Sequence, residues 1–105
     1  MAWPYLFIAG LLEVVWALLL KQSDGFSKLW PSLGFIAAGA GSIVLLTLAL
    51  RDLPVGTAYA AWTGIGAVGT ALFGVVFFSE SASGPRLASI ALIVIGVVGT
   101  YVFGG

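Results

Sequence analysis

One acidic residue, Glu13, lies in the middle of an apolar segment and is the residue best placed to do chemistry in this sequence. Apolar residues flank it on both sides, at positions 9–12 and 14–17. An ionised acidic side chain at the centre of a membrane helix costs about 3 kcal/mol to insert, and such residues usually have a function. An ionised carboxylate that reaches water binds a cation, whereas the protonated group does not. Glu13 therefore predicts a site where a cation and a proton compete, which is the minimal chemistry of an antiporter; the alternative is a neutral structural Glu hydrogen-bonded to a neighbouring helix.

Aromatic and small polar residues at helical spacing indicate the kind of cation. Helical spacings of three and four place Gly10, Trp16, Ala17 and Leu20 on the same face as Glu13. A second polar and aromatic face contains Tyr59, Trp62, Thr63 and Gly66, and Ser42 adds a hydroxyl in the middle of another apolar segment. Carboxylates, hydroxyls and aromatic faces bind planar or soft cations through charge-assisted hydrogen bonds and cation–π contacts. For each aromatic residue taken alone, packing in lipid or in the core is an equal alternative.

The charged residues divide the chain into four apolar runs, at residues 2–20, 29–50, 53–78 and 87–103. As helices these runs measure about 28, 33, 39 and 26 Å, and the hydrocarbon core of a bilayer is about 30 Å thick. We therefore expect an all-α membrane protein in which residues 1–105 form one domain of four transmembrane helices. Asp52 and its neighbours leave only a short link between the second and third runs, so these two helices should be antiparallel neighbours.

The composition excludes several classes of protein. Of the 105 residues, 61% are hydrophobic and 8% are charged, and the formal net charge is zero. So little charge does not cover a water-facing surface, which argues against a soluble globular enzyme, and the neutral balance argues against a nucleic-acid binder. Cysteine and histidine are absent, so disulfides, thiolate nucleophiles and Cys/His metal sites are not expected. We predict no enzymatic activity, no metal and no cofactor.

The positive charges orient the chain only weakly in a membrane. Arg51 would lie on one side, and Lys21, Lys28 and Arg86 on the other. One interpretation is that short loops hold few charges. The other is that the chain inserts in both directions and pairs with an inverted copy of itself, as inverted repeats do within larger transporters.

Glycines mark two further features. Gly64, Gly66 and Gly69 match G-x-G-x-x-G, but no strand precedes them, so a dinucleotide site is not expected. Clustered glycines permit kinks, and we expect a hinge between outward-open and inward-open states here. In the fourth run, Gly96 and Thr100 have the small-residue spacing that lets membrane helices approach closely, which favours dimerisation there.

Several segments of the sequence resemble the small multidrug resistance family. They are EVVWA at 13–17, KQSDGF at 21–26, LPVGTAYAAWTGIG at 53–66 and SES at 79–81. The likeness covers essentially the whole chain. Trp16 after Glu-Val-Val, Ser42 and the WTGIG motif at 62–66 resemble the guanidinium exporter subtype; the broad multidrug subtype usually has Gly-Thr in place of Trp16-Ala17.

The resemblance implies an antiparallel, dual-topology homodimer of four-helix subunits in the bacterial cell membrane. It implies export of guanidinium and small substituted guanidinium cations by proton antiport, with alternating access. Glu13 of each subunit would bind both proton and substrate, Gly10 would give the substrate room, and Tyr59 would line the cavity and help switch it. Hydrogen bonds from Trp16, Ser42 and Trp62 would orient Glu13. The dimerisation helix would be the fourth, with Leu92, Ile93, Gly96 and Val97 as interface candidates.

The sequence departs from that subtype at one place and leaves other functions open. Guanidinium exporters commonly carry a lysine near the end of the fourth helix, where this chain has Tyr101 in a stretch without basic residues. The alternatives are a broad exporter of quaternary ammonium and aromatic cations, one subunit of a heteromeric pair, a non-transporting helical subunit of a larger complex, and an ion channel.

Overall fold

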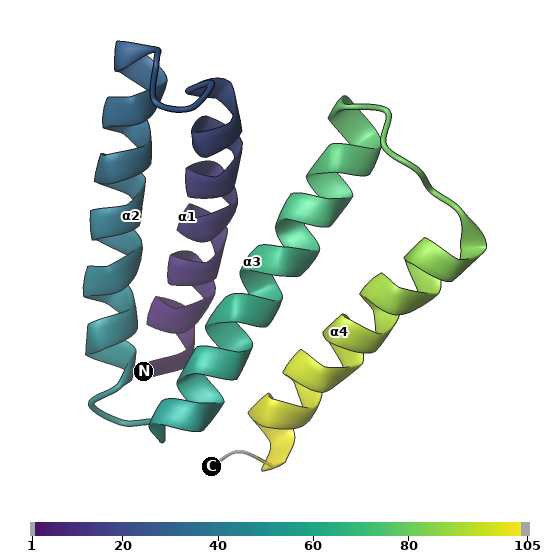
Figure 1. Cartoon of the computed structure of the whole chain (residues 1–105). Helices are drawn as coiled ribbons and strands as arrows, with labels where there is room; N and C mark the ends of the chain where they lie inside the picture. The colour runs from purple at the N-terminus through teal and green to yellow at the C-terminus, as the bar shows by residue number, and fades with distance from the viewer. Residues whose placement is uncertain (1, 104–105) are drawn as a thin grey trace.

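Four α-helices make up the chain in the computed structural model, which describes residues 2–103 (Figure 1). They are α1 (Ala2–Gln22), α2 (Leu29–Ala49), α3 (Val55–Phe77) and α4 (Gly84–Phe103). With 20 to 23 residues each, they measure about 30 to 35 Å. All four are long and apolar enough to cross a membrane. The expected all-α architecture of four membrane-spanning helices is confirmed.

The helix ends differ slightly from the apolar runs, and local chemistry explains why. α3 begins at Val55, two residues after the run starts, because Pro54 is its N-cap. α4 begins at Gly84, three residues before its run. Pro85 fits the first turn because the N–H that it lacks would have no helical partner there. The backbone N–H of Arg86 donates to the Ser83 hydroxyl at 3.3 Å, which satisfies another of the free donors in that turn.

A tight turn joins α1 to α2 and fixes how the two helices leave it. Asp24, Gly25 and Phe26 all have positive φ angles, of 49°, 70° and 67°. The fully buried Ser23 holds the turn together: its hydroxyl donates to the carbonyl of Leu20 at 2.6 Å and accepts from the N–H of Phe26 at 3.2 Å. The turn therefore holds α1 and α2 side by side (Figure 1).

α1 is the central helix of the packing. It contacts α2 on one side and α3 on the other. α4 packs mainly against α3 and touches α1 at one end, where the rings of Tyr101 and Trp3 meet edge to face with 4.9 Å between centroids. α4 diverges from α1 and α2 (Figure 1). The buried core is formed at one end of the bundle by small side chains and one leucine, namely Ala2, Leu6, Ala49, Ala58 and Ala61. Alanines at these positions let the membrane helices approach closely.

α4 leaves most of its apolar surface uncovered. Only Ile90 is buried among its described residues, while Leu92 and Ile93 are exposed. Val97, another of the predicted interface residues, is turned inward: it contacts Gly64 of α3, where an added Cβ would collide with it. Val97 therefore packs within the subunit. Ile93 also lies beside Gly64 but stays partly exposed, and Leu92 and Gly96 are open to a partner or to lipid.

Candidate cation site

Glu13 lies in the middle of α1 on the side that faces α3. Its carboxyl group rests on the backbone of Gly66, where an added Cβ would collide with Glu13 Oε1. The other oxygen, Oε2, is buried and has no hydrogen-bond partner among the described residues. A buried acceptor without a partner is costly. Glu13 therefore offers an open acceptor that a proton or a cation can satisfy.

Trp16, one helical turn further along α1, has the second open polar atom of the site. Its indole Nε1 is also buried without a hydrogen-bond partner in the described chain. The ring stacks on Trp62 of α3 with 6.3 Å between centroids, and it lies 5.6 Å from the ring of Phe35 of α2. Rings from α2 and α3 thus hold Trp16 in place one helical turn from Glu13.

The carboxylate and the aromatic rings line one cavity of about 340 Å³ between α1 and α3. It is lined by Glu13, Trp16, Ala17, Leu20, Tyr59, Trp62 and Thr63. Sites for small molecules measure about 300 to 1,000 Å³ and combine apolar walls with a few polar groups. The two faces expected from the sequence therefore meet in space and line the same cavity.

Ser42 joins three helices through one hydroxyl. The Ser42 side chain is fully buried, and its hydroxyl donates to the carbonyl of Ala9 at 2.7 Å. The same oxygen accepts a hydrogen bond of 2.9 Å from Trp62 Nε1. A hydroxyl can donate one hydrogen bond, and Ser42 donates it to a backbone carbonyl of α1. In the single subunit Ser42 and Trp62 thus bond to each other and to Ala9, and hydrogen bonding from either of them to Glu13 stays a prediction.

Of two further residues predicted to belong to the site, Tyr59 lies at the cavity and Gly10 lies at a helix contact. Tyr59 lines the cavity with its ring 5.8 Å from that of Trp62. Gly10 does not line it: an added Cβ there would lie 2.5 Å from Ile65 Cγ2 and 2.7 Å from Ile65 Cβ. The structure therefore gives Gly10 a packing role between α1 and α3, where close contact of the two helices requires it.

The three glycines of α3 are contact points of a continuous helix. Gly64 meets Val97 of α4, Gly66 meets Glu13, and an added Cβ at Gly69 would lie 2.5 Å from Val14 Cγ2. They let α1 and α4 approach α3 from different sides. Their predicted role as a hinge remains a prediction.

A second cavity, of about 420 Å³, starts at the same carboxyl group and runs toward the α3–α4 loop. Its far end is lined by Lys21, Phe78, Glu80 and Arg86. None of these four residues is a predicted site residue. A signal was present in the spacing of Gly66, Thr70 and Gly74, which leaves a strip of small residues along one face of α3. Within residues 2–103, no cluster of three or more acidic, Cys or His side chains could hold a metal ion.

Four membrane-spanning helices around one mid-span carboxyl and an aromatic cavity define a small helical transport protein of the membrane. The chain belongs to the Small Multidrug Resistance protein family, whose model matches residues 1–93. The family resemblance seen in the sequence is confirmed, and the chain is a multi-pass membrane protein.

Curated relatives of similar length share more than half of their residues with this chain. A protein of Yersinia pseudotuberculosis is 58% identical over 99 residues, which cover 94% of this chain and 95% of the relative. A protein of Escherichia coli K12 is 59% identical over 99 residues, with 94% of each chain covered. One of Proteus vulgaris is 56% identical over 99 residues, covering 94% of this chain and 95% of its own. Each is named "Guanidinium exporter".

Proposed function

We propose that the protein exports guanidinium and small substituted guanidinium cations in exchange for protons. The observation that carries this proposal is the buried, unpartnered Oε2 of Glu13 at an aromatic cavity of about 340 Å³. Guanidinium is planar and weakly hydrated, its N–H groups form a fork that matches a carboxylate, and its faces stack on aromatic rings. The names of the relatives support the same substrate class.

The mechanism follows from the charge of one side chain. Ionised Glu13 binds guanidinium through charge-assisted hydrogen bonds, with Trp16, Tyr59 and Trp62 providing the walls. A proton on the same carboxyl removes the negative charge and releases the cation. The two ligands therefore exclude each other at Glu13. If the cavity opens alternately to the two sides of the membrane, a proton gradient drives the cation outward.

We further propose that residues 1–105 form one transmembrane domain that works as an antiparallel, dual-topology homodimer in the bacterial cell membrane. Glu13 Oε2 and Trp16 Nε1 are an acceptor and a donor that both lack partners in the single chain, so a second copy could supply partners to both. The uncovered face of α4, with Leu92, Ile93 and Gly96, offers an apolar contact surface. The two Glu13 carboxyls would then share one cavity.

Transport by purified protein in liposomes tests this function. Guanidinium should accumulate against its gradient when a proton gradient is imposed, and Glu13→Gln should abolish accumulation. Asp52→Asn removes a carboxylate in the exposed α2–α3 link and is the matched control, expected to transport normally. Wild-type transport by Glu13→Gln would contradict the proposal. A bulky aromatic cation measured in parallel distinguishes the broad exporter, which should carry it as well as guanidinium.

A further inference from the structure

The cavity of about 420 Å³ has a carboxylate at each end. Glu13 lies at the inner end against Gly66, and Glu80 lies at the outer end against Gly74, where an added Cβ would collide with its carboxyl group. The two glycines are eight positions apart in α3, which corresponds to about 12 Å along the helix. Small residues between them, Ala67, Thr70 and Ala71, line the same cavity. A cation that enters from the loop would therefore meet Glu80 before it reaches Glu13.

The α3–α4 loop folds so that Glu80 turns back onto α3. The backbone N–H groups of Phe78 and Glu80 both donate to the carbonyl of Gly74, at 3.0 and 3.2 Å. Ser79 between them has a φ of 54°, the left-handed conformation that reverses the chain. The backbone thus returns the chain to α3 at Glu80, from where the side chain reaches Gly74.

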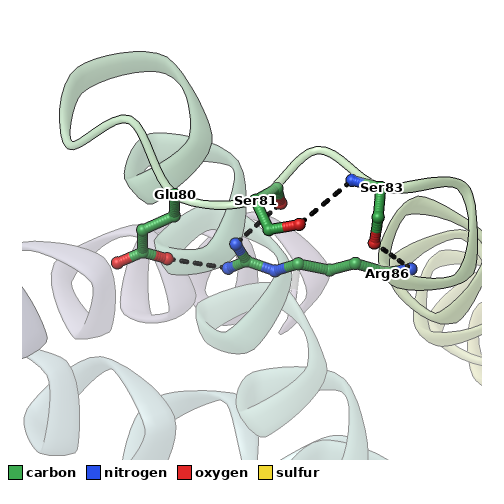
Figure 2. Close-up of polar contacts among 4 residues, drawn as sticks. All are labelled: Glu80, Ser81, Ser83 and Arg86. Atoms are coloured by element: carbon green, nitrogen blue, oxygen red, sulfur yellow. Dashed lines mark hydrogen bonds and ion pairs between the residues drawn. The ribbon is translucent and has the colours of Figure 1, made fainter.

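The outer end already holds a guanidinium group, that of Arg86 (Figure 2). Arg86 Nη2 donates to Glu80 Oε1 at 2.7 Å, and Nη1 donates to the carbonyl oxygen of Ser81 at 2.8 Å. Glu80 Oε1 and the Ser81 carbonyl therefore form a cradle with the spacing that two N–H groups of one guanidinium require. The same cradle fits any cation that presents two coplanar N–H donors.

The Arg86–Glu80 pair is well placed to exchange with a free cation. Both side chains are partly exposed, at 30% for Arg86 and 40% for Glu80. Exposed ion pairs are weak, because water competes and a long side chain must be held still. The other cation that lines this cavity is Lys21, whose Nζ lies 5.9 Å from the centroid of the Phe78 ring. Among residues 2–103, only Arg86 forms an ion pair with Glu80.

We propose that Glu80 and the Ser81 carbonyl form an outer binding site for guanidinium and monosubstituted guanidines, which Arg86 occupies when no substrate is present. The substrate class rests on the proposed function. The entering cation displaces the Arg86 side chain, is held next to the cavity, and moves on to Glu13. Arg86 thus acts as a tethered competitor that closes the site again after the cation has left.

Nuclear magnetic resonance of the arginine side chains tests this site directly. The chain has two arginines, Arg86 and Arg51, and the second lies in the exposed α2–α3 link as an internal control. The protein would be labelled with ¹⁵N-arginine in lipid nanodiscs and carry Glu13→Gln, so that the inner site does not contribute; Arg86→Lys assigns the signals. Titration with guanidinium chloride should shift the Nε–Hε signal of Arg86 and leave that of Arg51 in place. An equal concentration of tetramethylammonium, which has no N–H donors, should shift neither.

Glu80→Gln supplies the second readout. It should move the Arg86 signal to its released position and make it insensitive to guanidinium. In transport assays it should raise the KM for guanidinium about two- to fivefold with the maximal rate nearly unchanged, because an exposed ion pair contributes this much. Asp52→Asn should leave the KM as it is.

An Arg86 signal that guanidinium leaves unmoved, or that tetramethylammonium moves equally, would overturn the outer site. That result leaves the proposed function intact if Glu13→Gln abolishes transport. Conversely, normal transport by Glu13→Gln with a guanidinium-sensitive Arg86 signal would refute the role of Glu13 and retain the outer site.

Discussion

The indole N–H of Trp62 donates a hydrogen bond of 2.9 Å to the hydroxyl oxygen of Ser42, and that hydroxyl in turn donates a hydrogen bond to the carbonyl of Ala9. One hydroxyl therefore links α1, α2 and α3 at the level of the cavity. Trp62 lines that cavity and stacks on Trp16, so the position of the cavity wall depends on a buried serine that is not among the lining residues.

Ser42→Ala should weaken both the fold and the site. The change removes the two hydrogen bonds and leaves the Trp62 N–H without its partner, which costs about 1 kcal/mol in a membrane protein. We expect lower thermal stability and a fall of about fivefold in kcat/KM for guanidinium, since 1.4 kcal/mol is a factor of ten. Ser32→Ala is the control, because among the described residues the Ser32 hydroxyl bonds only to the carbonyl of Lys28, the N-cap of its own helix. Equal effects of the two substitutions would show that Ser42 has no special role.

The four spans could be predicted from the sequence because bilayer thickness sets the length of apolar segments and the few charges mark their ends. Glu13 and Trp16 could be placed together because residues three apart share a helix face. That Tyr59 and Trp62 share one face of α3 followed from the same periodicity applied to a second helix. These parts of the site depend on spacing within one helix.

Contacts between helices could not be predicted in the same way. Whether Gly10 faces a cavity or a neighbour depends on the rotation of α1 against α3, and the structure places it on Ile65. The bonds of Ser42 to Ala9 and Trp62 depend on the relative depth of three helices. The position of Glu80 at the second cavity depends on a chain reversal at Ser79. The positive φ there is adopted by a serine and not by a glycine, so the sequence does not indicate the turn.

Guanidinium affinity should fall as the pH falls. Protonation neutralises Glu13, and only the ionised form binds a cation, so each bound guanidinium must displace a proton in the pH range where the site is protonated. In that range the apparent Kd should rise about tenfold for each pH unit lost, and at higher pH it should level off. Adding guanidinium to weakly buffered, detergent-solubilised protein should release protons. Wild-type protein without proton release, or Glu13→Gln with it, would contradict competition at this residue.

Gly66→Ala should abolish transport while the protein still folds. An added Cβ at Gly66 would collide with the carboxyl group of Glu13, so the side chain must leave its place against α3. Alanine is itself favoured over glycine in a helix by up to about 1 kcal/mol, so helix formation is not impaired. Gly39→Ala is the matched control, because nothing lies within 4 Å of a Cβ at that position. Transport and thermal stability of the two variants, measured side by side, separate displacement of Glu13 from a general effect of the methyl group.

Trp16→Leu should widen the range of cations transported. The indole of Trp16 forms one wall of the cavity of about 340 Å³ and is held by Trp62 and Phe35. A leucine leaves more room beside Glu13 and removes an aromatic face, so guanidinium loses a stacking contact of about 0.5 to 2 kcal/mol, a factor of about two to thirty in affinity. Transport of guanidinium and of a bulky quaternary ammonium ion would be compared in the same liposomes. Trp30→Leu, a change at an exposed residue in the first turn of α2, is the control. If Trp16→Leu keeps the wild-type preference for guanidinium, the Trp16 ring does not set the size limit of the cavity.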